Sequence, residues 1–113
     1  PAAVRFVSVE PMLGPVDLSY YLPPRPIKNC SKEMLPYYNA HGFDWVICGG
    51  ETGPGARPIS SDSARNLRDQ CVAAGVPFFF KGWGNWYKNR YGRSDRCLDD
   101  KEWNQFPEVC NAN

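Results

Sequence analysis

Three short apolar segments, each closed by glycine or proline, constrain the fold of this chain most. They cover residues 5–10, 44–51 and 76–81 and are rich in β-branched or aromatic side chains. Segments of this length and composition, bounded in this way, are typical of β-strands. Their apolar runs are nearly continuous, which is typical of strands covered on both faces, as in a parallel sheet.

A capped amphipathic helix is predicted between the second and third of these strands. Ser60 or Ser61 can cap its first turn, and Gly75 can end it. An apolar stripe recurs at helical spacing between these ends, formed by Ala64, Leu67, Cys71 and Ala74. A strand, a capped helix and a further strand predict a βαβ unit with parallel strands. The fold class is therefore α/β, with a small parallel sheet.

The remaining segments are predicted to be less regular. Six prolines between residues 11 and 43 argue against a long helix there and favour a loop-rich crossover. A short helix can form at 31–38, and His41 before Gly42 is interpreted as a helix cap. Residues 85–106 are polar and aromatic, and residues 108–113 are interpreted as a disordered tail.

Composition excludes several classes of protein. The 113 residues carry a net charge of +1, which gives no global attraction to nucleic acid, to a membrane or to acidic substrates. No apolar run approaches the roughly 18 residues that span a membrane, and the start of the chain does not resemble a signal peptide. The five cysteines form no C-x-x-C pair, which predicts reduced thiols in a cytoplasmic protein and no metal site. The chain begins almost directly on a strand, which suggests a fragment.

Each predicted strand ends in a charged residue on its less apolar face: Glu10, Glu51 and Lys81. In α/β proteins, ligands bind at the carboxyl ends of parallel strands. Two carboxylates and an ammonium gathered there can perform acid–base catalysis or hold a polar small molecule. We therefore predict these three as the catalytic residues. The alternative is a salt-bridge network that closes this end of the sheet.

The glycine-rich stretch after the second strand is a candidate cofactor-binding loop. Gly49 and Gly50 allow a ligand to approach the main chain closely, Glu51 follows them, and Arg57 can hold an anion. The stretch lacks the Walker-A lysine and the G-x-G-x-x-G spacing, so it is only a weak match to a nucleotide-phosphate site. The alternative is a tight turn that leads into the helix.

A second candidate function is nucleic-acid binding by residues 83–96. Trp86, Lys88, Arg90 and Arg93 combine aromatic and basic side chains, which can stack bases and hold phosphates. The alternative is a solvated loop whose aromatic side chains reach the core. A purely structural or assembly role without any ligand is the third hypothesis.

Four motifs in order resemble a known family. They are R-F-V-S-V-E-P-M-L-G-P-V-D-L, D-W-V-I-C-G-G-E-T-G-P-G-A-R-P, L-R-D-Q-C-V-A-A-G-V-P-F-F-F-K-G-W-G and L-D-D-K-E-W-N-Q-F-P. Together they resemble the C-terminal half of an uncharacterised bacteriophage-protein family that is distantly similar to radical S-adenosylmethionine enzymes. The sequence departs from the usual family pattern at Thr52 and Gly82, where serine and glutamine are common.

The resemblance implies a partial TIM-like barrel, with residues 1–107 as the C-terminal portion of an α/β barrel. It also implies S-adenosylmethionine and an iron–sulfur cluster in a full-length protein, although the cluster-binding cysteines have no counterpart here. Glu51 would then hold the ligand's ammonium group, and Lys81 with Arg57 its carboxylate or a phosphate. Exposed strand edges in a half-barrel predict self-association.

Overall fold

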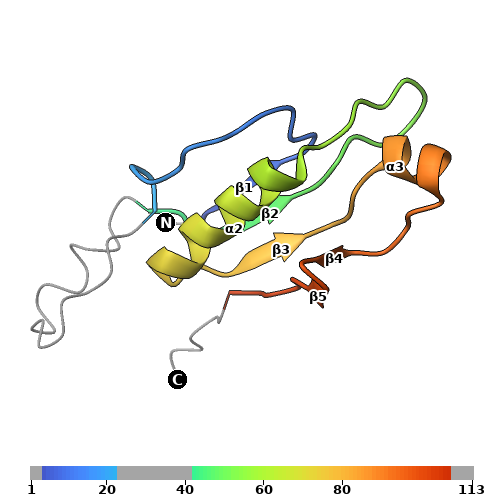
Figure 1. Ribbon diagram of the computed structural model, residues 1–113. Helices are drawn as coiled ribbons and strands as arrows, with labels where there is room; N and C mark the ends of the chain where they lie inside the picture. The colour runs from blue at the N-terminus through green and yellow to red at the C-terminus, as the bar shows by residue number, and fades with distance from the viewer. Residues whose placement is uncertain (1–3, 23–41, 108–113) are drawn as a thin grey trace, which may run out of the picture.

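Three parallel strands form the centre of the computed structural model, which describes residues 4–22 and 42–107 (Figure 1). The strands are β1 (Phe6–Val9), β2 (Trp45–Cys48) and β3 (Phe78–Phe80), paired in the order β1-β2-β3. The predicted α/β fold with a parallel sheet is confirmed, and each strand lies inside its predicted segment. The described strands form this open sheet and one hairpin and do not close into a barrel, so the TIM-like architecture is not confirmed.

Helix α2 (Ser61–Ala74) connects β2 to β3 and covers one face of the sheet (Figure 1). Ser60 is its N-cap and accepts a hydrogen bond from the backbone N–H of Ser63 at 3.3 Å. Gly75 ends the helix in the left-handed region, with a φ of 70°. The βαβ unit predicted from the sequence is therefore present.

Strand alternation places the core between the sheet and α2. Val46, Cys48, Phe78 and Phe80 point to the helix and are at most 1% exposed, and Leu67 of α2 packs among them. Burial of a large apolar side chain contributes roughly 1.5–3 kcal/mol, so this layer supplies much of the stability. The opposite face of the sheet has no helix over it among the described residues.

The segment after β1 completes the core by crossing α2. Met12, Leu18 and Leu22 are buried in the same cluster. The Gln70 side chain of α2 fixes this crossing, because its Nε2 donates to the Val16 carbonyl at 2.9 Å and its Oε1 accepts from the Leu18 N–H at 2.8 Å. Residues 11–22 thus form an irregular segment that ends in a turn, where the Tyr21 and Leu22 N–H groups donate to the Leu18 carbonyl. This agrees with the loop-rich crossover predicted for this part of the chain.

Two of the cysteines are small core residues, as the sequence predicted. Cys48 lies on β2 and Cys71 on α2, and both thiols are free and buried. Burial raises the pKa of each thiol to about 12, because the apolar surroundings disfavour the thiolate. Neither thiol therefore has the properties of a nucleophile or a metal ligand.

The polar and aromatic segment at 85–106 is largely ordered as a helix and a hairpin. Helix α3 spans Asn85–Tyr91, and strands β4 (Cys97–Leu98) and β5 (Lys101–Glu102) pair antiparallel. Asp99 and Asp100 form the turn with φ angles of 54° and 60°. Positive φ at both central positions is what a two-residue hairpin turn of type I′ requires. The solvated-loop alternative for residues 83–96 was therefore wrong where α3 forms.

The hairpin is fixed to α2 through Asp99. Its carboxylate accepts from Arg65 Nε at 2.7 Å and from Arg68 Nη1 at 2.5 Å. The chain then runs along the outer edge of β3, where the Phe80 N–H donates to the Trp103 carbonyl at 2.7 Å and the Gln105 N–H to the Phe78 carbonyl at 3.2 Å. One of the two sheet edges is therefore covered, and β1 forms the other. Self-association stays a prediction.

Acid is expected to weaken the attachment of the hairpin. Hydrogen bonds from Arg68, and then from Arg65, hold the pKa of Asp99 below its ordinary value of 3.8. A carboxyl whose pKa is lower in the folded state stabilises the fold above its unfolded pKa, and this contribution is lost as the pH falls through the folded value. Asp99→Asn should therefore lower the urea midpoint at pH 7, and this difference should shrink by pH 3.

The matched control for this measurement is Asp100→Asn. Asp100 occupies the same turn, yet it forms no ion pair with any residue in the described part of the chain. Its substitution should leave the midpoint nearly unchanged at both pH values. An Asp99→Asn effect that is equally large at pH 7 and pH 3 would contradict the ion-pair explanation.

Some predictions fall outside residues 4–22 and 42–107. They concern the helix at 31–38, the cap at His41, the tail at 108–113 and the environments of Cys30 and Cys110. Among the helices that are described, none has the length and apolar character needed to cross a membrane.

Candidate functional site

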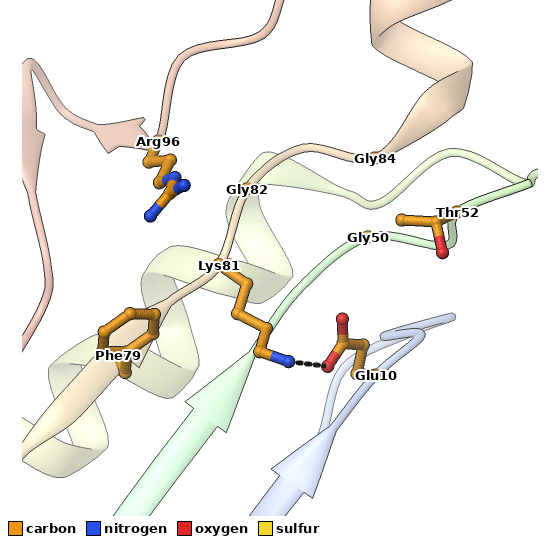
Figure 2. A pocket seen from close by; sticks show the side chains of 8 residues that line it. All are labelled: Glu10, Gly50, Thr52, Phe79, Lys81, Gly82, Gly84 and Arg96. Carbon is orange, nitrogen blue, oxygen red and sulfur yellow. Dashed lines mark ion pairs between the residues drawn. The ribbon is translucent and has the colours of Figure 1, made fainter.

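Glu10, Gly49 and Lys81 form one row across the carboxyl ends of the three strands. The register pairs Val9 with Cys48 and Cys48 with Phe80, so the next residue of each strand falls in line. Lys81 Nζ lies 3.2 Å from Glu10 Oε2, and the two side chains point toward each other in Figure 2. The structure thus brings together two of the three charged residues predicted at the strand ends.

Gly49 leaves room for this ion pair to pass over the central strand. A Cβ at this position would lie 3.2 Å from the Lys81 Cβ and 3.5 Å from Glu10 Oε1. Any larger side chain would therefore stand between the carboxylate and the ammonium. The role of this predicted cofactor-binding glycine is to let Glu10 and Lys81 meet.

The Glu10–Lys81 pair is too exposed to be a major source of stability. The side chain of Lys81 is 53% exposed and that of Glu10 is 28% exposed. Pairs of this kind contribute about 0–1 kcal/mol, because water screens the attraction and ordering the side chains costs entropy. The charges therefore remain accessible to a ligand.

Two glycines allow the loop after β2 and the loop after β3 to pack directly against each other. A Cβ at Gly50 would lie 2.2 Å from the Trp83 carbonyl oxygen, and a Cβ at Gly84 would lie 2.5 Å from that of Glu51. The backbones are joined by hydrogen bonds from the Gly50 N–H to Gly82 O at 3.0 Å and from the Asn85 N–H to Glu51 O at 2.9 Å. This contact forms a rigid wall beside the ion pair.

A pocket of about 380 Å³ opens between this wall, the end of β3 and the segment before β4 (Figure 2). The described residues that line it supply two cations and one carboxylate, an aromatic ring, a hydroxyl group and three glycines. The lining residues are Glu10, Gly50, Thr52, Phe79, Lys81, Gly82, Gly84 and Arg96. The volume lies at the lower end of the range for small-molecule sites.

Glu51 and Arg57 lie outside this lining and form a pair of their own. Arg57 Nη2 is 2.5 Å from Glu51 Oε2, and the backbone N–H and Nε of Arg57 both donate to Glu51 Oε1 at 3.2 Å. These hydrogen bonds lower the pKa of the Glu51 carboxyl. The predicted grouping of Glu51 with Glu10 and Lys81 is thus not seen, because Glu51 closes the loop to Arg57.

The four residues proposed for nucleic-acid binding lie on and just after α3. Arg90 lies over the Trp86 ring at 4.6 Å from its centroid. Arg93 lies 4.0 Å from the Trp83 centroid and pairs with Asp95 at 3.1 Å, whereas Lys88 is exposed. Two of the three cations therefore already have partners within the chain.

Sequence reasoning missed Arg96, Thr52 and Phe79 as pocket residues. The sequence did not distinguish Arg96 from the other basic residues near it, because its position in the pocket depends on how the hairpin docks. Phe79 did carry a signal, since strand alternation puts it on the same face as Lys81, two residues away. Thr52 follows the glycine pair and Glu51 directly, and although it departs from the usual family pattern, no local signal marked it as a pocket residue.

The described residues do not suit an iron–sulfur cluster. No group of three histidine, cysteine or acidic side chains capable of holding a metal occurs within residues 4–22 and 42–107. The described thiols on β2 and α2 are buried with raised pKa values, whereas a cluster requires thiolates. We assign no step to such a cluster in this chain.

Comparison with models of known protein families gives a match over most of the chain. Residues 1–107 match the family described as Protein of unknown function (DUF5131). No curated protein and no solved structure matches the chain.

Proposed function

The chain belongs to the DUF5131 family of proteins of unknown function, and we propose that it binds a small anionic ligand in the pocket at the carboxyl end of its sheet. The observation that carries this proposal is the presence of two cations, Lys81 and Arg96, in the lining of one pocket of about 380 Å³. Glu10 is the only acidic residue among the described residues that line it, so these residues together carry a net positive charge.

The chemistry of the lining supports an anion rather than a cation. The planar guanidinium of Arg96 can donate two parallel hydrogen bonds to a carboxylate or phosphate, and the Lys81 ammonium can donate a third. The Thr52 hydroxyl can donate another. Glu10 can accept from a ligand N–H or O–H, which would orient a ligand that has both kinds of group.

Substitution of either cation tests the proposal. Lys81→Met and Arg96→Gln remove one charge each while keeping most of the side-chain volume. Each should weaken the binding of inorganic phosphate by roughly 10-fold or more, because a hydrogen bond to a charged group contributes about 1.5–3 kcal/mol. Titration of the ¹⁵N-labelled protein by NMR measures this affinity and shows which amides respond.

Matched controls are available on α3. Lys88→Met and Arg90→Gln make the same substitutions on exposed side chains outside the pocket. They should leave phosphate affinity within about twofold. The urea midpoint of Lys81→Met should move little, since the exposed ion pair contributes at most about 1 kcal/mol. Absence of phosphate binding, or equal losses in site and control variants, would refute the proposal.

We further propose that the sheet is part of an α/β barrel related to radical S-adenosylmethionine enzymes of phage or prophage origin. Two features support a barrel: the strands are parallel, and only one face carries a helix among the described residues. S-adenosylmethionine carries both an ammonium and a carboxylate, which suit Glu10 and the two cations. In the same titration it should shift pocket amides in a Lys81-dependent way. Phosphate binding without this response would refute only the finer proposal.

A further inference from the structure

The pocket has an aromatic floor as well as two cations. Phe79 lies two residues before Lys81 on β3, so strand alternation directs both side chains to the same side of the sheet. Both residues line the pocket (Figure 2). A ligand that fills the pocket can therefore reach both the Lys81 side chain and the Phe79 ring.

Neighbouring aromatic residues hold the Phe79 ring in place. The Trp45 centroid lies 6.3 Å away at 89°, and the Phe106 centroid lies 5.4 Å away at 67°. Edge-to-face packing of this kind favours one orientation of the ring. Phe79 is half-buried, so part of its surface remains free to contact a ligand.

Arg96 faces this floor from the segment before β4 (Figure 2). Arg90 lies over the Trp86 ring. Four other arginines among the described residues form ion pairs with carboxylates: Arg57, Arg65, Arg68 and Arg93. Within residues 4–22 and 42–107, Arg96 has no such carboxylate or ring. Its guanidinium is therefore available for an anion.

We infer that the ligand of this pocket is an aromatic anion, in which a flat ring carries a carboxylate or phosphate group. This inference rests on the proposed function. The ring packs on Phe79, and the anionic group lies between Lys81 and Arg96. The volume of about 380 Å³ suits one ring system with its charged substituent. Aromatic anions are a narrower class of ligand than small anions in general, which the two cations alone would accept.

A pair of phosphate esters tests the role of the ring. Phenyl phosphate and methyl phosphate carry the same anionic group and differ in the ring. Phenyl phosphate should bind roughly threefold to tenfold more tightly, since an aromatic pair contributes about that factor in affinity. Benzoate and acetate form the corresponding carboxylate pair, and comparison of the two pairs shows which anionic group the pocket prefers.

In Phe79→Leu, phenyl phosphate should lose its advantage in affinity over methyl phosphate. The matched control is Phe6→Leu, because Phe6 is 57% exposed on the same face and does not line the pocket. In the unsubstituted protein, intermolecular NOEs should connect the phenyl protons with the Phe79 ring, which gives a readout independent of the variant's stability.

The outcomes separate this inference from the proposed function. Equal affinity for the two esters, both dependent on Lys81, would refute the role of the ring and leave anion binding intact. Failure of both esters and of inorganic phosphate to bind would refute the proposed function itself. Ring selectivity that survives in Phe79→Leu, or that lacks NOEs to Phe79, would also overturn the inference.

Discussion

Gly50→Ala is expected to destabilise the fold by about 3 kcal/mol or more. The added Cβ would lie 2.2 Å from the Trp83 carbonyl oxygen and 2.6 Å from the carbonyl carbon. Both atoms belong to the backbone, so no change of rotamer can relieve the collision. The two loops must separate, and the hydrogen bond from the Gly50 N–H to Gly82 O must lengthen or break. Urea unfolding followed by circular dichroism measures the loss.

The chain supplies a matched control for this substitution. Gly14 has no atom within 4 Å of the position that a Cβ would occupy. Gly14→Ala should therefore change stability by less than about 1 kcal/mol, with a small gain from the reduced entropy of the unfolded chain. Gly84→Ala should resemble Gly50→Ala, because its Cβ would lie 2.5 Å from Glu51 O and its φ is 88°. A Gly50→Ala variant with nearly unchanged stability would show that the two loops are not held together in this way.

The strands and α2 were predictable because their signals are local. Ser60 and Gly75 mark the ends of α2, and apolar runs mark β1, β2 and β3. Parallel pairing then places Glu10 and Lys81 at one edge of the sheet without any knowledge of tertiary contacts. This part of the candidate site follows from alternation and topology alone.

Glu51 shows where strand alternation stops being informative. Strand β2 ends at Cys48, and the chain beyond it is shaped by the contact of Gly50 with the loop at Trp83. The period of two no longer applies there, so the side chain of Glu51 turns to Arg57. The position of Glu51 depends on a contact between segments more than 30 residues apart along the chain.

Helix α3 and the hairpin were missed because their local signals are weak. The N-cap of α3 is Gly84, which makes no side-chain capping bond, and the helix contains several aromatic residues of modest helix propensity. The β4–β5 turn uses Asp99 and Asp100, whereas Asn-Gly is the usual signal for a two-residue hairpin. Arg96 enters the pocket only because this hairpin docks on α2, and no local pattern encodes that docking.

Gly49→Val is expected to uncouple the ion pair and to weaken phosphate binding roughly 10-fold or more, about as much as Lys81→Met. Gly49 is buried between Glu10 and Lys81, and even a methyl group there would lie 3.2 Å from the Lys81 Cβ. The branched side chain would displace Lys81 from Glu10 and from the pocket. Valine suits an extended backbone, so the cost in stability should stay near the 1–3 kcal/mol of an overpacked core position.

Gly49→Ala is the graded control for this prediction, since a single methyl group requires the neighbouring side chains to move by only a few tenths of an ångström. Phosphate affinity should fall in the order glycine, alanine, valine, while circular dichroism confirms that both variants are folded. In the Gly49→Val background, Lys81→Met should cause little further loss, because the ammonium has already left the pocket. Full additivity of the two substitutions would mean that Gly49 does not act through Lys81.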